Sequence, residues 1–395
     1  MKWNPVQIAQ ICLKTRIYDP RQDPDTKFIY VDISAIDRDA KVITVTSKFL
    51  GVNAPNRARK EIRKGDILVS TIRPNLNSIA LVPQHLDGQI ASTGFCVLRP
   101  NKTTIVGKFL FYFTTTSTFI NTLSGLVRGA HYPAVSDRDV KEINLPLPSL
   151  SEQHRIVEIL DQADALRKKR AEADIKAAGI LPALFYQMFG DPATNPKGWD
   201  KKLFDDTFDD CTSKCPKLQR NAYQSFGKFP VIDQGKEMIA GYTNDENLLA
   251  PVRQPIIIFG DHTRVVKIVD FPFVAGADGS RIFIEKEDFS LPFLAYQLKL
   301  HSIPNLGYSR HMRVVRRLHF IAPPLDLQKK FAQNVLDTHM LQKSQAKSSS
   351  RIEDLFSTLL HRAFTGDLTS SWREAHLEEL LQEMECQAKQ LNSQR

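Results

Sequence analysis

The strongest constraint on the fold is an internal repeat, because residues 139–191 and 314–367 run parallel at a separation of about 175 residues. Gln153 matches Gln328 near the start of the two copies, and both copies end on a glycine followed by an aspartate. A fixed internal period is typical of duplicated architecture. Each copy follows a long stretch whose counterpart is far less similar, so the pattern predicts one scaffold that holds two different globular inserts.

The first copy is predicted to be a long helix. Ser149 stands three residues before Glu152, which is the spacing of a capping box at a helix start. Apolar residues then recur at alternating threes and fours, which predicts a coiled-coil seam. The seam consists of Ile156, Ile159, Ala163, Leu166, Ala173, Ala177, Ile180 and Leu184. We expect Pro182 to kink or break the last turns and Gly190 to end the helix.

The second copy is predicted to be a helix of equal length, from about Asp326 to Gly366, with a polar, serine-rich middle at residues 344–350. Two such helices, separated by a globular insert, can each bury the apolar stripe that neither could bury alone. We therefore expect them to pack against each other, antiparallel.

The end of the chain carries a third apolar stripe, from Leu377 to Leu391, with glutamates on the opposite side. Trp3 and Trp372 both resemble Trp199, which follows the first helix, so the two ends of the chain look like halves of one boundary. We expect the segment 6–12 and the C-terminal tail to lie near each other. The alternative is that the acidic tail reaches out to a partner subunit.

The two inserts are predicted to be α+β domains. Short β-type runs alternate in them with turns and a few helical stretches. These runs include 28–33 and 67–69 in the first insert, and 256–259 and 281–284 in the second.

The charge of the inserts favours a polyanionic partner. Lys and Arg total 53 against 44 acidic residues, which gives a net charge of +9. Residues 88–136 and 289–325 contain basic residues and no acid, and both windows lead into a repeated helix. A basic surface free of acids is what binding along a phosphate backbone requires.

Loops in both inserts carry residues that can pair with base edges or with phosphates. In the first insert the predicted DNA-binding residues are Arg57, Arg59, Arg63, Arg73, Asn75, Thr93, Arg128, His131 and Tyr132. In the second they are Gln234, His262, Thr263, Arg264, Asp278, Arg281, Tyr308, Arg310, His311, Arg313, Arg316 and Arg317.

Several enzyme classes lack their motifs here. The chain has no phosphate-binding Gly-x-x-x-x-Gly-Lys-Ser/Thr loop and no glycine turn of an adenine methyltransferase. Asp261-His262 is the one pair that a metal-dependent nuclease could use, and Cys211 and Cys215 lack a second pair of zinc ligands. The sequence also lacks an apolar run of membrane-spanning length and a signal-peptide core, so we expect a cytoplasmic DNA-binding protein without catalysis and without a metal.

These motifs resemble those of the specificity subunit of Type I restriction–modification systems over essentially the whole chain. Leu145-Pro146-Leu147-Pro148-Ser149-Leu150-Ser151-Glu152-Gln153 matches the helix-start motif of that family, and its second copy keeps the Gln but lacks the Glu. The strings 54–59 and 65–68 resemble one class of target recognition domain. The strings 258–264, 276–279 and 307–311 resemble another.

The resemblance implies an α+β protein with two target recognition domains, at 1–148 and 191–322. Two long helices, at 149–190 and 323–366, separate them as an antiparallel coiled coil, and an amphipathic tail follows at 367–395. Each domain would read one half of a bipartite, asymmetric DNA target, and the helices would set the spacer between the halves.

The resemblance also implies partners. The helices would dock two modification subunits that carry S-adenosylmethionine and methylate adenine, and restriction subunits that use ATP and Mg²⁺ would join them. No cofactor is expected in this chain. A standalone DNA-binding scaffold and a metal-dependent nuclease remain the alternatives.

Overall fold

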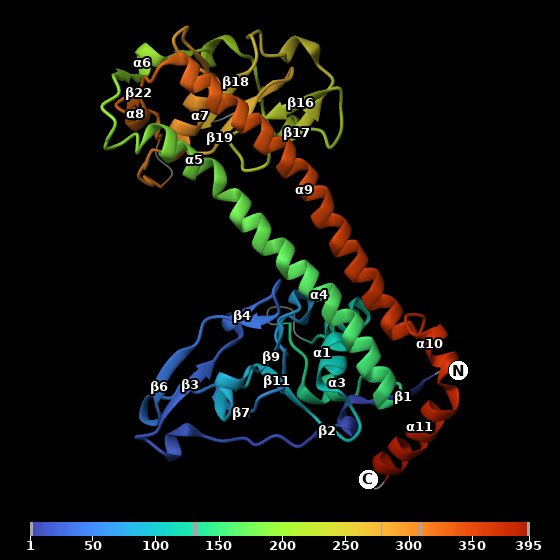
Figure 1. Ribbon diagram of the computed structural model, residues 1–395. Helices are drawn as coiled ribbons and strands as arrows, with labels where there is room; N and C mark the ends of the chain where they lie inside the picture. Colours follow the sequence, from blue (N-terminus) through green and yellow to red (C-terminus); the bar gives the residue numbers. More distant parts are fainter. Residues whose placement is uncertain (1–2, 129–132, 278, 308–309, 393–395) are drawn as a thin grey trace. The chain divides into compact units, whose positions relative to one another are not determined.

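The computed structural model describes residues 3–128, 133–277, 279–307 and 310–392, and the chain divides into two compact units (Figure 1). Unit 1 consists of Met1–Lys169 and Ser350–Arg395, and unit 2 consists of Arg170–Ser349. Each unit therefore combines one predicted insert with parts of both long helices. Among the described residues, no helix is long and apolar enough to cross a membrane.

Unit 1 contains two four-stranded sheets. One has the order β6-β3-β10-β7, formed by Ser47–Leu50, Lys27–Val31, Gln89–Ser92 and Ala58–Ile62. The other has the order β2-β11-β8-β9, formed by Cys12–Leu13, Phe95–Pro100, Ile67–Ser70 and Ile79–Leu81. Every residue of β8 is buried, which suits a continuous apolar run rather than an alternating one.

Smaller elements complete unit 1. Two strand pairs are formed by β1 (Asn4–Gln7) with β12 (Asn144–Leu147), and by β4 (Ile36–Asp37) with β5 (Val42–Ile43). The helices are α1 (Gly107–Thr115), α2 (Ser117–Gly125), α3 (Asp137–Lys141), α10 (Ser370–Ala375) and α11 (Leu377–Asn392). Ser136 and Asp139 form a capping box at the start of α3.

Unit 2 repeats this plan with different side chains. Its sheet β14-β21-β18-β19 is formed by Phe208–Asp210, Ser280–Glu285, Ile256–Gly260 and Val266–Val269. Its sheet β15-β20-β16-β17 is formed by Lys217–Leu218, Val274–Gly276, Phe229–Ile232 and Gly241–Thr243. The remaining elements are α6 (Phe204–Thr207), α7 (Leu291–Leu300), α8 (Met312–Val315) and the pair β13 (Lys201–Leu203) and β22 (His319–Ile321). The buried β18 takes the place that β8 has in unit 1.

The first repeated helix is interrupted earlier than predicted. It consists of α4 (Leu150–Ala178) and α5 (Ile180–Phe189), and the break lies at Gly179 rather than at Pro182. Pro182 is the third residue of α5, where an amide has no partner within the helix, so the proline costs no hydrogen bond there. Gly190, with a φ of +81°, ends α5 as predicted.

The second repeated helix is the single helix α9 (Leu325–Thr365). In unit 1, the Arg167 guanidinium of α4 lies 2.9 Å from the Glu353 carboxylate and 4.2 Å from the centre of the Phe356 ring. In unit 2, Ser349 donates a hydrogen bond of 2.9 Å to Asp174, and the Phe185 ring meets that of Phe331. Residue numbers rise along the first helix and fall along the second, which is antiparallel packing.

The predicted coiled-coil seam is only partly buried. Ile156 and Leu160 belong to the core of unit 1, but Leu166 is 47% exposed and Ile180 in unit 2 is 53% exposed. The middle of each helix pair is instead joined by polar side chains. The expectation that the two stripes bury each other throughout was therefore wrong for this part of the helices.

Candidate nucleic-acid interface

Three predicted loops of unit 2 meet at the tip of strand β18. The Asp261 amide donates a hydrogen bond of 2.7 Å to the Gly279 carbonyl, and the Asp261 carbonyl accepts one of 2.9 Å from the His311 amide. These backbone bonds join the loop after β18, the loop before β21 and the segment that enters α8. We call this arrangement the hub of unit 2.

Unit 1 has the same hub at the tip of strand β8. The Thr71 amide donates a hydrogen bond of 2.9 Å to the Gly94 carbonyl, and the Thr71 carbonyl accepts one of 2.9 Å from the Val135 amide. The three loops joined here again carry residues that the sequence predicts to bind DNA. The two hubs share their backbone bonds, but they differ in every side chain other than the glycine.

An arginine with left-handed backbone follows each hub. Arg73 has a φ of +48° and Arg264 a φ of +63°, and both are exposed. This conformation costs a residue with a Cβ roughly 1–2 kcal/mol, and such strain concentrates at functional sites. Backbone bonds hold it in place, from Arg73 to the Pro133 carbonyl at 2.8 Å and from Arg264 to the Gly260 carbonyl at 2.7 Å.

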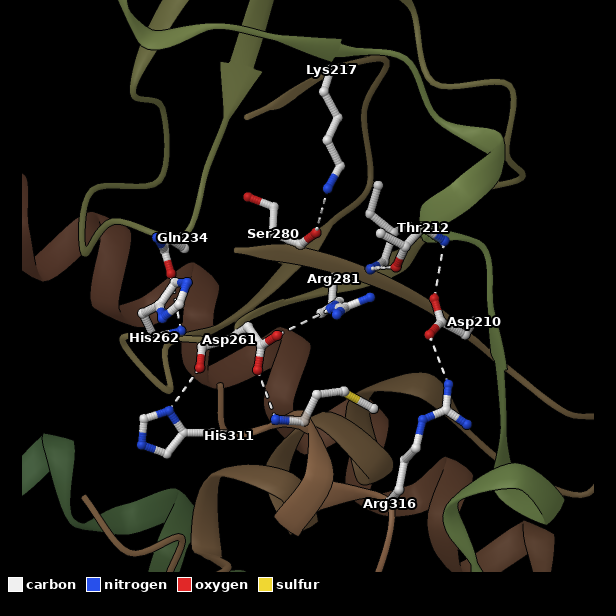
Figure 2. A network of polar contacts seen from close by, with 12 residues as sticks. Asp210, Thr212, Lys217, Gln234, Asp261, His262, Ser280, Arg281, His311 and Arg316 are labelled. Atoms are coloured by element: carbon white, nitrogen blue, oxygen red, sulfur yellow. Dashed lines mark hydrogen bonds and ion pairs between the residues drawn. The ribbon is translucent and has the colours of Figure 1, made fainter. Parts of the chain in front are cut away.

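Asp261 and His311 form the buried centre of the unit 2 hub (Figure 2). The Asp261 carboxylate accepts from the Met312 amide at 2.7 Å and from Nε of Arg281 at 3.3 Å. His311 Nδ1 lies 2.7 Å from the Asp261 carbonyl, and His311 Nε2 accepts from the Leu306 amide at 3.2 Å. Nδ1 therefore carries the proton, because a carbonyl can only accept.

The prediction that His311 lies at the DNA was wrong in its direct form. Its ring is 0% exposed and both ring nitrogens are hydrogen-bonded within the protein. Its sequence neighbours Arg310 and Arg313 are exposed. His311 thus holds the loop that presents these arginines and is not itself a surface group.

Gln234 connects the hub of unit 2 to the neighbouring sheet. Its side-chain oxygen accepts from the His262 amide at 3.1 Å, and its carbonyl accepts from the Thr263 hydroxyl at 2.6 Å. Gly279, with a φ of +81°, passes so close that a Cβ there would lie 2.5 Å from the Gln234 side-chain oxygen. Only glycine fits this position, which is the physical reason for the Gly in the predicted loop.

Several predicted arginines are held by carboxylates. Arg316 lies 2.7 Å from Asp205 and 3.2 Å from Asp210, which compensate the charge expected to bind phosphate. The other pairs are Arg59 with Asp19 at 3.3 Å, Arg63 with Glu61 at 3.0 Å, Arg128 with Asp139 at 3.4 Å and Arg281 with Asp261 at 3.3 Å.

Other predicted residues remain open to a partner. Within the part of the chain that the structure describes, no carboxylate pairs with Arg57, Arg73, Arg264, Arg310, Arg313 or Arg317, and all six are exposed. Of these, Arg264 donates one hydrogen bond within the protein, from Nη1 to the Ile303 carbonyl at 3.0 Å. Asn75 and Thr93 are exposed beside the unit 1 hub. His131, Tyr132, Asp278 and Tyr308 lie outside the described residues.

The residues considered for a metal do not converge. The Asp261 carboxylate is occupied by Arg281 and Met312, and no group of three metal-ligand side chains occurs among the described residues. Cys211 and Cys215 are buried, and burial raises the pKa of both thiols, that of Cys215 to about 11. These thiols are therefore protonated at neutral pH, whereas a metal binds the thiolate.

Two hub residues were not among the predicted DNA-binding residues. Asp261 was named as part of the loop 258–264 and as half of a possible nuclease pair, and Thr71 was not named. The available signal was position, because each directly follows the buried run of a predicted strand.

A model of the Type I restriction modification DNA specificity domain matches residues 2–177. The chain is 29% identical over 139 residues to the specificity subunit of the HindI Type I restriction enzyme of Haemophilus influenzae, which covers 35% of this chain and 30% of that protein. It is 27% identical over 194 residues to the MjaIX specificity subunit of Methanocaldococcus jannaschii, covering 45% and 43%. The alignments with these two curated relatives thus span less than half of each.

The similarity in structure extends further. A solved structure from a study of complex assembly and conformational transition in the Type I R-M system matches with a TM-score of 0.61 and 27% identity, over 93% of this chain and 98% of that chain. The S subunit of a Type I restriction–modification system from M. genitalium matches with a TM-score of 0.55 over 92% and 96%, and its 16% identity supports the fold alone.

Proposed function

Because the chain is similar to specificity subunits of Type I restriction–modification systems in sequence and in structure, we propose that it is such a subunit and that it selects the DNA sequence on which the complex acts. The observation that carries this proposal is the duplicated hub. Each unit joins three reader loops through the same backbone bonds and follows them with a strained, exposed arginine. Each unit would read one half of a bipartite target.

The two half-sites would differ in sequence. Thr71 and Val135 in unit 1 stand where unit 2 has Asp261 and His311, and sequence is read by side chains rather than by the shared backbone. A target with two unlike halves is asymmetric.

Phosphate contacts would supply much of the affinity. The net charge of +9 and the exposed arginines without a carboxylate partner support an affinity that falls with salt, by a slope of about 0.9 per phosphate contacted. Arg316, which two carboxylates hold, would contribute less to this slope than Arg313 or Arg317.

The long helices would dock two modification subunits. Large apolar side chains of the helices are exposed in this chain, and contiguous exposed apolar residues mark protein interfaces. They are Leu166 and Leu355 in unit 1, and Ile175, Ile180, Leu336, Met340 and Leu341 in unit 2. S-adenosylmethionine, ATP and Mg²⁺ would bind to the modification and restriction subunits, and this chain would form and break no bonds itself.

The test is to co-express the chain with its modification subunits and map methylated adenines in host DNA. The proposal expects a bipartite, asymmetric motif and co-purification of the subunits. Purification of the chain without a methyltransferase, together with unmethylated DNA, would favour the standalone scaffold instead.

Two variants sharpen this test. Deleting one heptad from both long helices removes about 10 Å of each helix, so the spacer should shorten by about 3 base pairs at 3.4 Å each. Arg264→Ala should cost about 1–3 kcal/mol and relax one position of the second half-site. An unchanged spacer would refute the ruler role, and intact affinity and specificity would make the Arg264 loop an ordinary turn.

A further inference from the structure

The buried acid Asp261 lies among loops that are predicted to bind DNA, where a negative charge is unexpected. It is 1% exposed, it lies between the predicted reader loops, and its charge would repel phosphate if it faced the DNA. The corresponding hub residue of unit 1 is the uncharged Thr71, whose hydroxyl donates to the Gly94 carbonyl at 2.9 Å. The backbone bonds of the hub therefore do not require a carboxylate, and the acid in unit 2 needs another explanation.

The carboxylate of Asp261 divides its two oxygens between two groups. One oxygen accepts from the Met312 amide, and the other accepts from Nε of Arg281. Within the described residues, only the Nε–H of Arg281 is taken in a hydrogen bond, and the side chain is 29% exposed. The two terminal nitrogens of this guanidinium are thus left for an outside acceptor (Figure 2).

An arginine with both terminal nitrogens available matches the hydrogen-bond acceptors of guanine. Two terminal N–H groups can donate side by side to O6 and N7 of guanine in the major groove, which is the most common specific contact of proteins with DNA. A carboxylate behind Nε fixes the plane of the guanidinium before DNA arrives, which reduces the conformational entropy lost on binding. The hub of unit 1 has no such pair among its described residues. Its hub residue Thr71 carries no carboxylate, and Cys96 pairs with Val69 of β8 as Arg281 pairs with Phe259 of β18.

We infer that Arg281 reads a guanine in the half-site of unit 2 and that Asp261 is the positioning residue that holds the Arg281 guanidinium in the reading orientation. This inference rests on the proposed function and names the base class that this site takes. The half-site of unit 2 should therefore contain a guanine, whereas no guanine is predicted for the half-site of unit 1.

The test uses the full chain in complex with its modification subunits and selects bound sequences from a randomised double-stranded DNA library. Arg281→Lys keeps the charge and loses the bidentate fork. Discrimination for guanine at one position of one half-site should fall roughly 5- to 150-fold, the range for one bidentate pair. The other half-site should stay unchanged.

Asp261→Asn separates positioning from folding. The side-chain oxygen that accepts from Met312 remains, but the charge that orients Arg281 is lost. Discrimination should fall at the same position as in Arg281→Lys, and the double variant should lose little more than Arg281→Lys alone. Thr71→Val in the unit 1 hub is the matched control, and it should leave the guanine position untouched.

The outcomes distinguish the two proposals. If the unaltered complex selects no bipartite sequence, the proposed function fails. If it selects one, but Arg281→Lys retains the preference at every position, or if the unit 2 half-site contains no guanine, the inference alone is overturned. The same holds if Asp261→Asn relaxes several positions at once, because that would be a general loss of loop structure.

Discussion

The starts of the two long helices share one buried glutamine but differ in the residue before it, and they therefore make different contacts with the rest of their units. In unit 1, Gln153 accepts from the Val106 amide at 2.7 Å and donates to the carbonyls of Thr104 and Pro148. In unit 2, Gln328 accepts from the Ser290 amide at 3.0 Å and donates to the carbonyls of Asp288 and Pro323. Both glutamines are fully buried, and each joins the start of a long helix to the segment that enters α1 in unit 1 or α7 in unit 2.

The residue before the glutamine differs. In unit 1 it is Glu152, whose carboxylate accepts from Trp3 Nε1, from the Thr369 hydroxyl and from Arg373 Nε at 2.7 Å. In unit 2 it is Leu327, which packs against the apolar core of that unit. The chain is continuous around Leu327 in unit 2. At Glu152 in unit 1, by contrast, residues from the two ends of the sequence, Trp3 and Arg373, come together. Polar contacts thus hold separate segments where apolar packing suffices for a continuous chain.

Removal of the tail should have the largest effect on this comparison. Truncation after Thr369 deletes the contacts of Glu152 with Arg373, of Ser151 with Glu383 and of Thr104 with Gln387. At about 1–3 kcal/mol each, these sum to on the order of 5 kcal/mol. Hydrogen exchange should show faster opening of unit 1 and an unchanged unit 2. An unchanged Tm together with lost methyltransferase co-purification would show the tail to be a subunit hook.

Breaking the buried ion pair should cost almost as much. Glu152→Leu copies the unit 2 residue but leaves Arg373 buried and unpaired, so the free energy of unfolding should fall by about 3–5 kcal/mol. The double variant Glu152→Leu with Arg373→Met removes both charges and should recover most of the loss. Chemical denaturation of the unaltered chain and of the two variants measures this, and a double variant as unstable as the single one would contradict it.

The two glutamines should respond alike. Gln153→Ala removes the partner of the Val106 amide and of the Pro148 carbonyl, while the Thr104 carbonyl keeps its hydrogen bond from Gln387. Gln328→Ala removes the same kinds of contact at Ser290, Asp288 and Pro323, so each variant should cost about 2 kcal/mol. Hydrogen exchange should assign the first loss to unit 1 and the second to unit 2. A clear difference between the two costs would show that the equivalent contacts do not have equivalent weight.

Acid should produce the smallest change. Burial raises the pKa of Glu383, but hydrogen bonds from the side chain and amide of Ser151 outweigh it, so the pKa lies below its usual 4.5. A lowered pKa stabilises the folded state above pH 4.5, and this contribution is lost as the pH falls through the lowered value. The effect should be below about 1 kcal/mol, as for other partly exposed charges. Tail protection measured against pH should show it, and Glu383→Gln should abolish it.

Local signals in the sequence were sufficient for the elements themselves. The repeat predicted two long helices, the apolar runs predicted strands β8, β18 and β21, and Gly190 marked the end of α5. Such signals depend on residues within a few positions of each other, where backbone preference and periodicity act directly.

Local signals also failed where a longer-range contact competed. Ser149 accepts from the Glu152 amide at 3.3 Å as a capping box requires, but the Glu152 carboxylate turns to Arg373 instead of returning to the helix start. The expectation that the ends of the chain lie together agrees with this contact, and with the Trp3 ring 4.8 Å from the Arg373 guanidinium.

The sequence by itself determined the duplicated scaffold, the type of each element and the loops whose side chains can hydrogen-bond to base edges. Tertiary structure alone decided that these loops meet at two equivalent hubs, that His311 is buried while Arg310 is exposed, and that Glu152 binds a residue 221 positions away. Helix and strand preferences act between near neighbours, whereas burial and the pairing of charges depend on which distant segments the packed core brings together.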